Sequence, residues 1–264
     1  MALRSALINA MANAARKAQR SLTRDFNEVE QLQVSKKGPA DFVSAADRKA
    51  EKILHQELSK LRPDFGFIME EAGRIEAKDG KTYWVIDPLD GTTNFLHGIP
   101  HFAISIAVQR EGELIAGIVL DVIRDELFWA EKGVGAYMNE RRIRVSARRK
   151  LPEALFATGI PFHGRPGHAQ FLKEMTSVMG EVAGIRRMGA AALDLAYVAA
   201  GRYDGFWEAG LSPWDIAAGI VLVREAGGMV TELKGGDTMI ETGGIVAAND
   251  VLHGPLLKLL AKSA

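Results

Sequence analysis

Apolar residues near the N-terminus recur at the spacing of one helix face. They stand at Leu3, Leu7, Met11, Ala14, Ala18 and Leu22. Basic residues lie between them, so the pattern predicts an amphipathic helix rather than a signal peptide or a membrane span. A helix on a membrane surface is an alternative, but packing on the protein core is the more common use of such a stripe. A second stripe predicts a helix over residues 44–61, which Pro63 ends.

Short apolar runs follow, and two of them lead directly into acidic residues. Residues 65–69 precede Glu70 and Glu71, and residues 83–86 precede Asp87. Three further runs are separated by short turn-like segments, which favours antiparallel pairing. They cover residues 102–108, 114–120 and 126–130. The first half of the chain therefore predicts two helices packed on a mainly antiparallel sheet.

The second half alternates between predicted strands and predicted helices. Strands are expected at residues 155–158, 185–188, 205–207, 229–231 and 245–247. Helices are expected from residue 168, over 191–200, over 214–225 and from residue 249. This alternation predicts a layered α/β half. We divide the chain into an N-terminal α+β subdomain, 1–148, and a C-terminal α/β subdomain, 149–264, which share a face.

Composition narrows the class of protein. The chain has 264 residues, of which 47% are hydrophobic, enough for a large core in one domain or two joined subdomains. Its 33 basic and 33 acidic residues cancel, which argues against a general nucleic-acid binder. The absence of cysteine excludes disulfides, thiolate metal sites and cysteine catalysis, and it fits a cytoplasmic enzyme.

Candidate chemistry gathers in the run from Asp87 to Asn94, which reads Asp-Pro-Leu-Asp-Gly-Thr-Thr-Asn. Pro88 cannot donate a ladder hydrogen bond, so we expect the chain to leave the sheet there. Two carboxylates three residues apart at a strand end are costly in one pocket unless a cation neutralises them. Mg²⁺ prefers such oxygen ligands, and a pair of ions could clamp an in-line displacement at phosphorus. The simpler interpretation, a pair of turn or cap residues, stays open at this point.

A second class of phosphatase also uses a paired-aspartate motif. Haloacid-dehalogenase-like enzymes have Asp-x-Asp-Gly-Thr, in which the first aspartate is a covalent nucleophile. Here the spacing from Asp87 to Asp90 is one residue longer. That insertion would turn the nucleophile away from its substrate, so we reject this interpretation.

Together with motifs elsewhere, the run closely resembles the inositol monophosphatase family, in particular its bacterial branch. The resemblance covers essentially the whole chain. Its second signature is residues 214–219 followed by residues 224–228, and residues 189–208 are similar to the segment on the substrate side. The N-terminal elements of the family match at Lys36, Asp41, Asp47, Glu70 and Glu71. The fold that this implies is a layered α-β-α-β-α sandwich, usually a homodimer.

The resemblance implies a role for each acidic residue. A first Mg²⁺ would be held by Glu70, Asp87 and the carbonyl of Leu89. A second would be held by Asp87, Asp90 and Asp215. Glu70 and Thr92 would orient the attacking water, and Asp47 would accept a hydrogen bond from the Thr92 hydroxyl. From the residues alone, Asp47 and Asp215 are equally typical of helix-terminal carboxylates.

The resemblance also implies a substrate side. Its residues would be Asp90, Gly91, Thr92, Arg186, Gly189, Ala190, Ala191, Glu208 and Asp215. Glu208 would bind polyol hydroxyls, although by itself it is typical of a solvated surface residue. Ala190 stands where many relatives carry Ser or Thr, which removes a hydroxyl from the expected substrate wall.

The expected reaction is hydrolysis of a small phosphorylated polyol, with myo-inositol 1-phosphate first among the candidates. The family uses two or three Mg²⁺ ions, with Mn²⁺ as a substitute and Li⁺ as an inhibitor. Relatives act instead on fructose-1,6-bisphosphate, histidinol phosphate or 3′-phosphoadenosine nucleotides. Some bacterial relatives act with RNA polymerase and Nus factors in transcription and ribosomal-RNA processing. An inactive scaffold is a further alternative, although every expected ligand is present. No membrane partner is expected.

Overall fold

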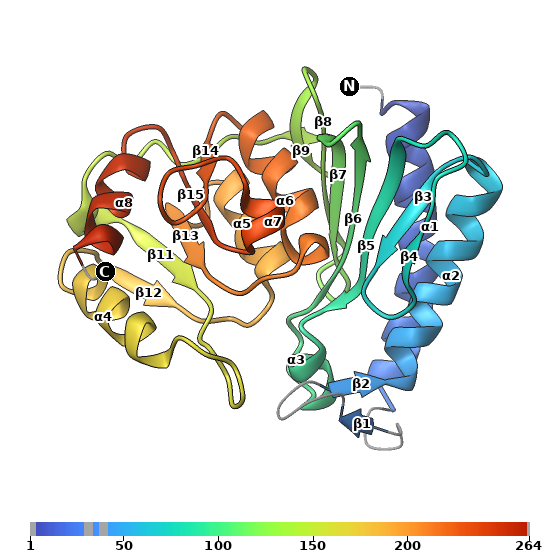
Figure 1. Cartoon of the computed structure of the whole chain (residues 1–264), viewed down its shortest axis with the longest axis horizontal. Coiled ribbons are helices and arrows are strands. Elements are labelled where there is room, and N and C mark those ends of the chain that lie inside the picture. Colours follow the sequence, from blue (N-terminus) through green and yellow to red (C-terminus); the bar gives the residue numbers. More distant parts are fainter. Residues whose placement is uncertain (1–3, 29–33, 37–41, 263–264) are drawn as a thin grey trace.

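Two sheets and three helical layers alternate across the molecule (Figure 1). The computed structural model describes residues 4–28, 34–36 and 42–262. Asp41 and the side chain of Lys36 lie outside the described residues. The arrangement is the α-β-α-β-α sandwich that the resemblance implied, so the expected fold class is confirmed.

The larger sheet has eight strands and belongs to the first half of the chain. In spatial order they are β10 (Arg141–Arg142), β9 (Gly135–Met138), β8 (Glu126–Glu131), β7 (Glu113–Asp121), β6 (Ala103–Arg110), β5 (Thr82–Asp90), β3 (Gly66–Met69) and β4 (Gly73–Ile75). All neighbours pair antiparallel except β3 and β5, which are parallel. Because parallel strands end at the same edge, the residues after β3 and those at the end of β5 lie close together.

The smaller sheet has five strands from the second half. In order they are β12 (Gly184–Arg186), β11 (Leu155–Thr158), β13 (Gly205–Glu208), β15 (Ile245–Ala248) and β14 (Met229–Thr231). A short antiparallel pair, β1 (Val34–Lys36) with β2 (Phe42–Ser44), stands apart from both sheets. The division at residues 148 and 149 falls between β10 and β11 and stays a prediction, because helices of the second half also pack on the larger sheet.

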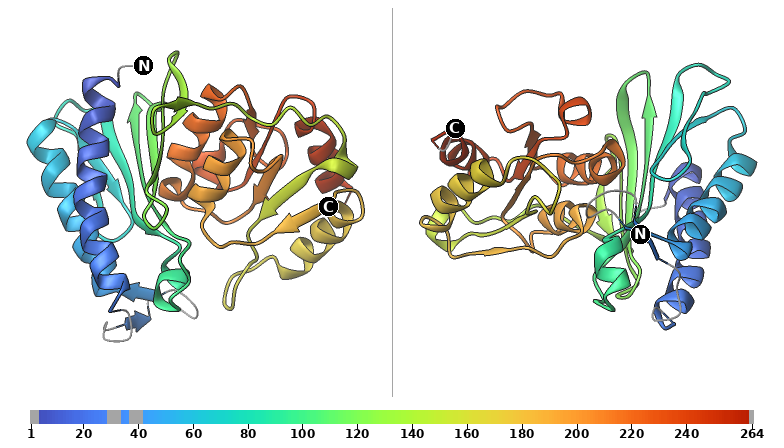
Figure 2. Two further views of the ribbon diagram at one scale, coloured as in Figure 1. Left: turned by 180° about the vertical axis from the view of Figure 1, so that it is seen from behind. Right: turned by 60° about the horizontal axis from the view of Figure 1, so that its bottom comes forward.

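Helices fill the spaces between and outside the sheets (Figures 1 and 2). On the outer face of the larger sheet lie α1 (Ala6–Phe26) and α2 (Ala45–Leu61). The central layer is α5 (Ala191–Ala199) with α6 (Pro213–Glu225), and the last layer is α4 (His168–Met179) with α8 (His253–Ala261). The remaining short helices are α3 (Thr92–Leu96), the 3-10 turn Leu151–Glu153 and α7 (Met239–Thr242).

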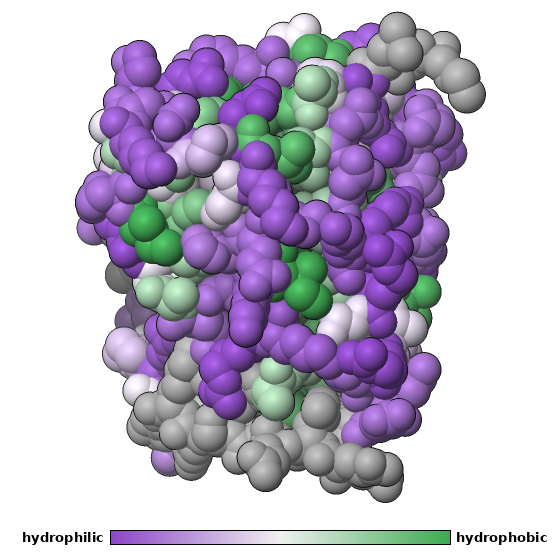
Figure 3. All heavy atoms as spheres, turned by 90° about the vertical axis from the view of Figure 1, so that its right-hand side faces the viewer, coloured by the Kyte–Doolittle hydropathy of each residue, from purple (hydrophilic) through white to green (hydrophobic). Residues whose placement is uncertain are grey.

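The N-terminal stripe packs on the core, as preferred above. Ile8, Met11 and Leu22 of α1 are completely buried, and the Ser5 hydroxyl accepts a hydrogen bond from the amide of Ile8 at 3.1 Å. The opposite surface of this layer is mainly hydrophilic (Figure 3). Across the described ranges, no helix combines the length and apolar character needed to cross a bilayer.

The exit of the chain at Pro88 was predicted incorrectly. Strand β5 continues to Asp90, and its register against β6 shifts between Asp87, opposite Ser105, and Asp90, opposite Ala103. The three residue steps from Asp87 to Asp90 on β5 therefore span the same length of the sheet as the two residue steps from Ser105 to Ala103 on β6. This bulge accommodates a proline without a ladder N–H inside a central strand, and it turns the two aspartates toward the same edge.

Candidate metal and substrate site

The bulge at the end of β5 builds the centre of the site. The amide of Leu89 donates to Asp87 Oδ1 at 2.9 Å, which fixes a carboxylate that is only 2% exposed. Gly91 has φ +97°, and a side chain there would press on His101 and Phe102. Glycine therefore allows the sharp change from β5 into α3.

Thr92 links this turn to α2. Its Oγ1 lies 3.0 Å from the carbonyl oxygen of Leu89 and 3.4 Å from Asp47 Oδ2. The Thr92–Asp47 contact expected from the resemblance is thus present in the structure. The hydroxyl has one hydrogen to donate, so its lone pairs stay available to a molecule in the site.

The turn after β3 brings two more carboxylates. Oxygens of Asp47, Glu70 and Glu71 all lie within 4.8 Å of one another. Glu51 of α2 fixes this turn, because its carboxylate accepts from the amides of Glu71 at 2.8 Å and Ala72 at 2.9 Å. The turn after β3 and helix α2 therefore bring Glu70 and Asp47 close enough to Asp87 for their charges to act on it.

Asp215 closes the site from the second half of the chain. The amide of Ser212 donates to Asp215 Oδ2 at 2.7 Å, so the helix-terminal role predicted as an alternative is present as well. The Ser105 hydroxyl donates to the carbonyl of Trp214 at 3.1 Å, which ties the start of α6 to strand β6. One carboxylate oxygen of Asp215 can cap the helix while the other faces the site.

The carboxylates at the centre of the site repel one another electrostatically. Burial and the negative charge of Glu70 raise the pKa of Asp87 well above its usual value, with smaller effects of Asp90, Asp215 and Asp47. Burial and Asp215 do the same to the pKa of Asp90. Within the part of the chain that the structure describes, neither Asp87 nor Asp90 forms an ion pair. A set of crowded, buried oxygen donors fits a hard divalent cation such as Mg²⁺ or Mn²⁺.

A cavity of about 180 Å³ opens beside these carboxylates. Its lining includes Asp90, Gly91, Thr92, Gly189, Ala190, Ala191, Glu208 and Asp215, all of them among the residues expected on the substrate side. Two hydrogen bonds hold its walls together across the two halves. The Ala192 amide donates to Asp90 Oδ2, and Asn94 Nδ2 donates to the carbonyl of Met188, both at 2.8 Å.

Glu208 stands at the end of β13, on the cavity wall opposite Asp90. Burial of its carboxyl group raises the pKa of Glu208 to about 8, with a further rise from Asp215 and an opposing effect of Arg187. A side chain at Gly159 would collide with this carboxyl group. Glu208 is therefore a partly buried residue of the cavity wall, unlike the solvated residue that its sequence context suggests.

Comparison with known proteins fits this geometry. Residues 3–264 match the model of the inositol monophosphatase family. The chain belongs to this family. It is 58% identical to a protein of Mesorhizobium japonicum named inositol-1-monophosphatase, over 98% of this chain and 97% of that relative. It is 48% identical to the Nus factor SuhB of Pseudomonas aeruginosa, over 92% and 91% of the two chains. The crystal structure of the extragenic suppressor protein suhB from Bartonella henselae superposes with a TM-score of 0.96, at 57% identity, covering 98% and 100% of the chains.

One residue that the inositol monophosphatase resemblance placed on the substrate side is elsewhere. Arg186 ends strand β12, is exposed, and donates from Nη1 to the carbonyl of Ile185 at 3.1 Å. Its neighbour Arg187 lines the cavity instead and lies over Gly189, where a side chain would collide with the guanidinium. Successive side chains of an extended segment point to opposite sides, so an error of one position exchanges the two arginines.

Several residues at the cavity have no sequence pattern that would have identified them as part of the site. Gly159, Ile160, Phe162 and Arg165 come from the segment after β11. Asn94 was noticed only as part of the octet, although it is buried and also donates to the carbonyl of His101 at 2.8 Å. Its place at the end of the signature run is the one clue in the sequence that could have suggested its positioning role.

Proposed function

We propose that this protein hydrolyses phosphate monoesters of small polyols in a Mg²⁺-dependent reaction, with myo-inositol 1-phosphate as its main substrate. The observation that carries this proposal is the crowding of carboxylates from the turn after β3, from β5, from α2 and from α6, next to a polar cavity that Asp90 and Asp215 line. Family membership and the names of its relatives support the same activity.

The metal ligands are those that the family resemblance implies, and the mutual repulsion of Asp87, Glu70, Asp90 and Asp215 supports them. Glu70, Asp87 and the carbonyl of Leu89 would hold one ion, and Asp87, Asp90 and Asp215 a second. When bound, Mg²⁺ supplies positive charge that offsets the carboxylates and draws electron density from the phosphate ester. Mn²⁺ has the same ligand preference and is expected to substitute.

The residues of the chain then orient the attacking water and accept its proton. Glu70 accepts a proton from the attacking water, whose second hydrogen is held by the Thr92 hydroxyl while Asp47 fixes that hydroxyl. The water oxygen bonds to phosphorus as the bond to the alcohol oxygen breaks on the opposite side, and the departing oxygen takes a proton from solvent. Backbone amides near Gly91 bind phosphate oxygens, and Glu208 accepts hydrogen bonds from polyol hydroxyls. No phosphorylated side chain is formed.

A phosphate-release assay tests the proposal. The protein should hydrolyse myo-inositol 1-phosphate with Mg²⁺, lose activity with a chelator, and be inhibited by Li⁺. Reaction in ¹⁸O-water should place one label in the released phosphate. Trapping of a phosphorylated side chain during turnover would contradict direct attack. A higher kcat/KM for fructose-1,6-bisphosphate, histidinol phosphate or a 3′-phosphoadenosine nucleotide would reassign the substrate.

A second role is favoured by the relative named Nus factor SuhB. In this role the chain binds RNA polymerase or Nus factors, and its phosphatase site is not required. Pull-down with these proteins should then succeed equally with the wild-type chain and with Asp87→Asn. Failure of both to bind would remove this second role.

The remaining family traits complete the proposal. We expect a homodimer in the cytoplasm, without direct binding to nucleic acid. Light scattering of the purified chain measures the oligomeric state, and cell fractionation measures the location. An RNA-binding assay at several salt concentrations tests for nucleic-acid binding.

A further inference from the structure

A second and larger chamber opens from the candidate site. It has a volume of about 420 Å³, against about 180 Å³ for the polar cavity. The two share Gly159, Glu208 and Asp215 in their walls. A molecule held at the carboxylates can therefore extend past Glu208 into the chamber. Volumes of a few hundred Å³ are typical of pockets that enclose a ring-sized ligand.

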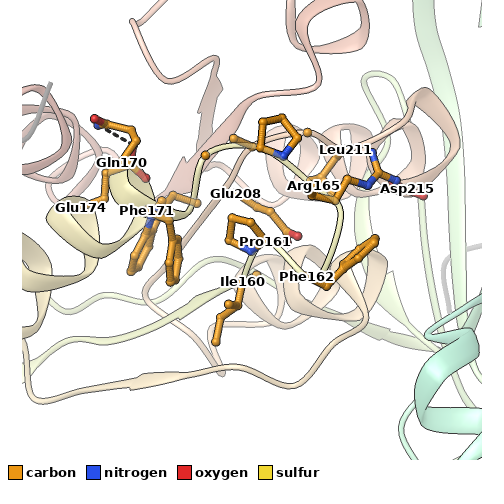
Figure 4. A pocket seen from close by; sticks show the side chains of 16 residues that line it. Ile160, Pro161, Phe162, Arg165, Gln170, Phe171, Glu174, Glu208, Leu211 and Asp215 are labelled. Atoms are coloured by element: carbon orange, nitrogen blue, oxygen red, sulfur yellow. Dashed lines mark hydrogen bonds between the residues drawn. The ribbon is translucent and has the colours of Figure 1, made fainter. Parts of the chain in front are cut away.

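The walls of this chamber differ in character from the polar cavity. Pro161 comes from the segment after β11, Phe171 from α4 and Trp207 from β13, and none of these three lines the polar cavity, whereas Phe162 lines both. Figure 4 shows Pro161 and Phe171 beside Glu208. Such surfaces bind aromatic or aliphatic groups, whereas polyol hydroxyls would lose their hydrogen bonds there.

The open side carries a flat cationic surface. The guanidinium of Arg165 lies 5.0 Å from the ring centroid of Phe162, and both side chains are exposed. A planar ring can stack on such a pair. Figure 4 shows both side chains between Glu208 and Asp215, near the shared wall.

Two polar features remain inside the chamber. Trp207 is 1% exposed, and its Nε1 has no hydrogen-bond partner among the described residues. Gln170 donates to Glu174 at 3.0 Å, and Figure 4 shows this pair at the end farthest from Asp215.

We propose that the chamber binds an aromatic ring attached to the alcohol side of the phosphate ester, so that, of two esters of the same polyol, the one with such a ring is preferred. The inference rests on the proposed phosphatase activity. The phosphate stays at the carboxylates, the polyol carbon chain passes Glu208, and the ring lies among Phe162, Phe171 and Trp207. The chamber is away from the reacting bond, so it contributes to binding rather than to the chemical step.

A matched pair of esters tests this inference. Glycerol 1-phosphate and its 3-O-benzyl ether differ only in the ring. With Mg²⁺, the benzyl ether should have a KM about ten-fold lower, as partial burial of one ring would give, while kcat stays within about two-fold. Phe171→Ala should reduce this KM ratio to near one without changing the kinetics of glycerol 1-phosphate, because Phe171 lines the chamber but not the polar cavity.

The control variant is Leu172→Ala. Leu172 adjoins Phe171 on α4, is 63% exposed and does not line the chamber, so its KM ratio should match that of the wild type. Equal KM values for the two esters in the wild type would overturn the chamber proposal and leave the phosphatase proposal intact. The same outcome follows if Leu172→Ala lowers the ratio as much as Phe171→Ala. Hydrolysis of neither ester, nor of myo-inositol 1-phosphate, would overturn both proposals.

Discussion

Two groups of buried aspartates in this protein have opposite electrostatic surroundings. Asp121 and Asp204 are completely buried, and each has an arginine, Arg124 at 3.1 Å and Arg148 at 3.2 Å. Asp87 is also buried, but its charged neighbours are further carboxylates. Burying an unneutralised carboxylate is costly. Asp121 and Asp204 are therefore neutralised internally, whereas among the described residues Asp87 has no cationic partner.

Backbone hydrogen bonds distinguish Asp121 from Asp87, whereas Asp204 and Asp87 each accept one. Asp121 Oδ1 accepts from the amides of Ile123 at 3.2 Å and Arg124 at 2.9 Å, and Asp204 Oδ2 accepts from Leu155 at 2.7 Å. Asp87 accepts one such bond, from Leu89. The structural acids hold turns and strands in place. Asp87 is oriented by this one amide, and among the described residues no cationic side chain pairs with its carboxylate.

The largest effect is expected from Asp87→Asn. Removal of this ligand should lower kcat/KM for the phosphate monoester by about a thousand-fold or more, because ion binding and ester activation are lost together. The amide keeps the shape and can still accept from Leu89, while the repulsion by Glu70 disappears. Without metal, the melting temperature should therefore rise by about 2–4 °C. Activity measurements and calorimetry on the same samples check both.

Magnesium titration provides the control for that variant. Mg²⁺ should raise the melting temperature of the wild type by mass action and have little effect on Asp87→Asn. The comparison between the two groups of acids would be broken if the variant kept its activity, or if it were less stable than the wild type without metal.

Asp204→Asn should have the opposite effect on stability. It removes the charge that pairs with Arg148 and accepts from Leu155, so the free energy of unfolding should fall by about 2 kcal/mol. Activity of the remaining folded protein should stay close to that of the wild type. Urea unfolding with and without Mg²⁺ measures this, and a gain in stability similar to that of Asp87→Asn would contradict it.

The sequence identified the acidic residues of the site more completely than the residues that form the cavity around them. Asp87, Asp90 and Glu70 follow apolar runs, so their place at strand ends was visible in the pattern. The course of the chain through Pro88 was not, because a bulge depends on the register of the neighbouring strand. The layered order of helices and sheets was implied by the resemblance rather than by any local pattern.

The walls of the cavity depended on contacts between distant segments. Asn94 bonds to Met188, and Gly159 leaves room for Glu208. Neither residue has a local pattern that reveals its partner. The exchange of Arg186 for Arg187 has a similar origin, because a three-residue edge strand is too short to fix which side chain points inward. Residue type was thus predictable where chemistry required it, and orientation was not.

Gly159→Ala extends the comparison to Glu208, a carboxyl at the site whose pKa is also raised. A methyl group at residue 159 collides with the carboxyl of Glu208 and should displace it. KM for myo-inositol 1-phosphate should rise about ten-fold, while phenyl phosphate, which has no hydroxyls for Glu208, should change less than about two-fold. Gly254→Ala is the control, because a side chain there meets open space. Equal losses for both substrates would argue against a role of Glu208 in polyol binding.

The smallest effect is expected at a partly exposed, internally neutralised acid. Hydrogen bonds from Arg202, both at 2.6 Å, lower the pKa of Glu126 below its usual 4.5. Because the folded pKa is the lower one, the stabilisation is fully present above pH 4.5 and is lost as pH falls through the folded pKa. Glu126→Gln should therefore lower the free energy of unfolding by about 1 kcal/mol at pH 7. The difference from the wild type should shrink steadily in urea titrations below pH 4.5.

Glu153→Gln, which affects an exposed pair with Lys150 at 3.5 Å, should change stability by less than about 0.5 kcal/mol at any pH. A difference for Glu126→Gln that grew toward low pH would mean that Arg202 does not stabilise the charged carboxylate, and the contrast with Asp87 would lose its internally neutralised side.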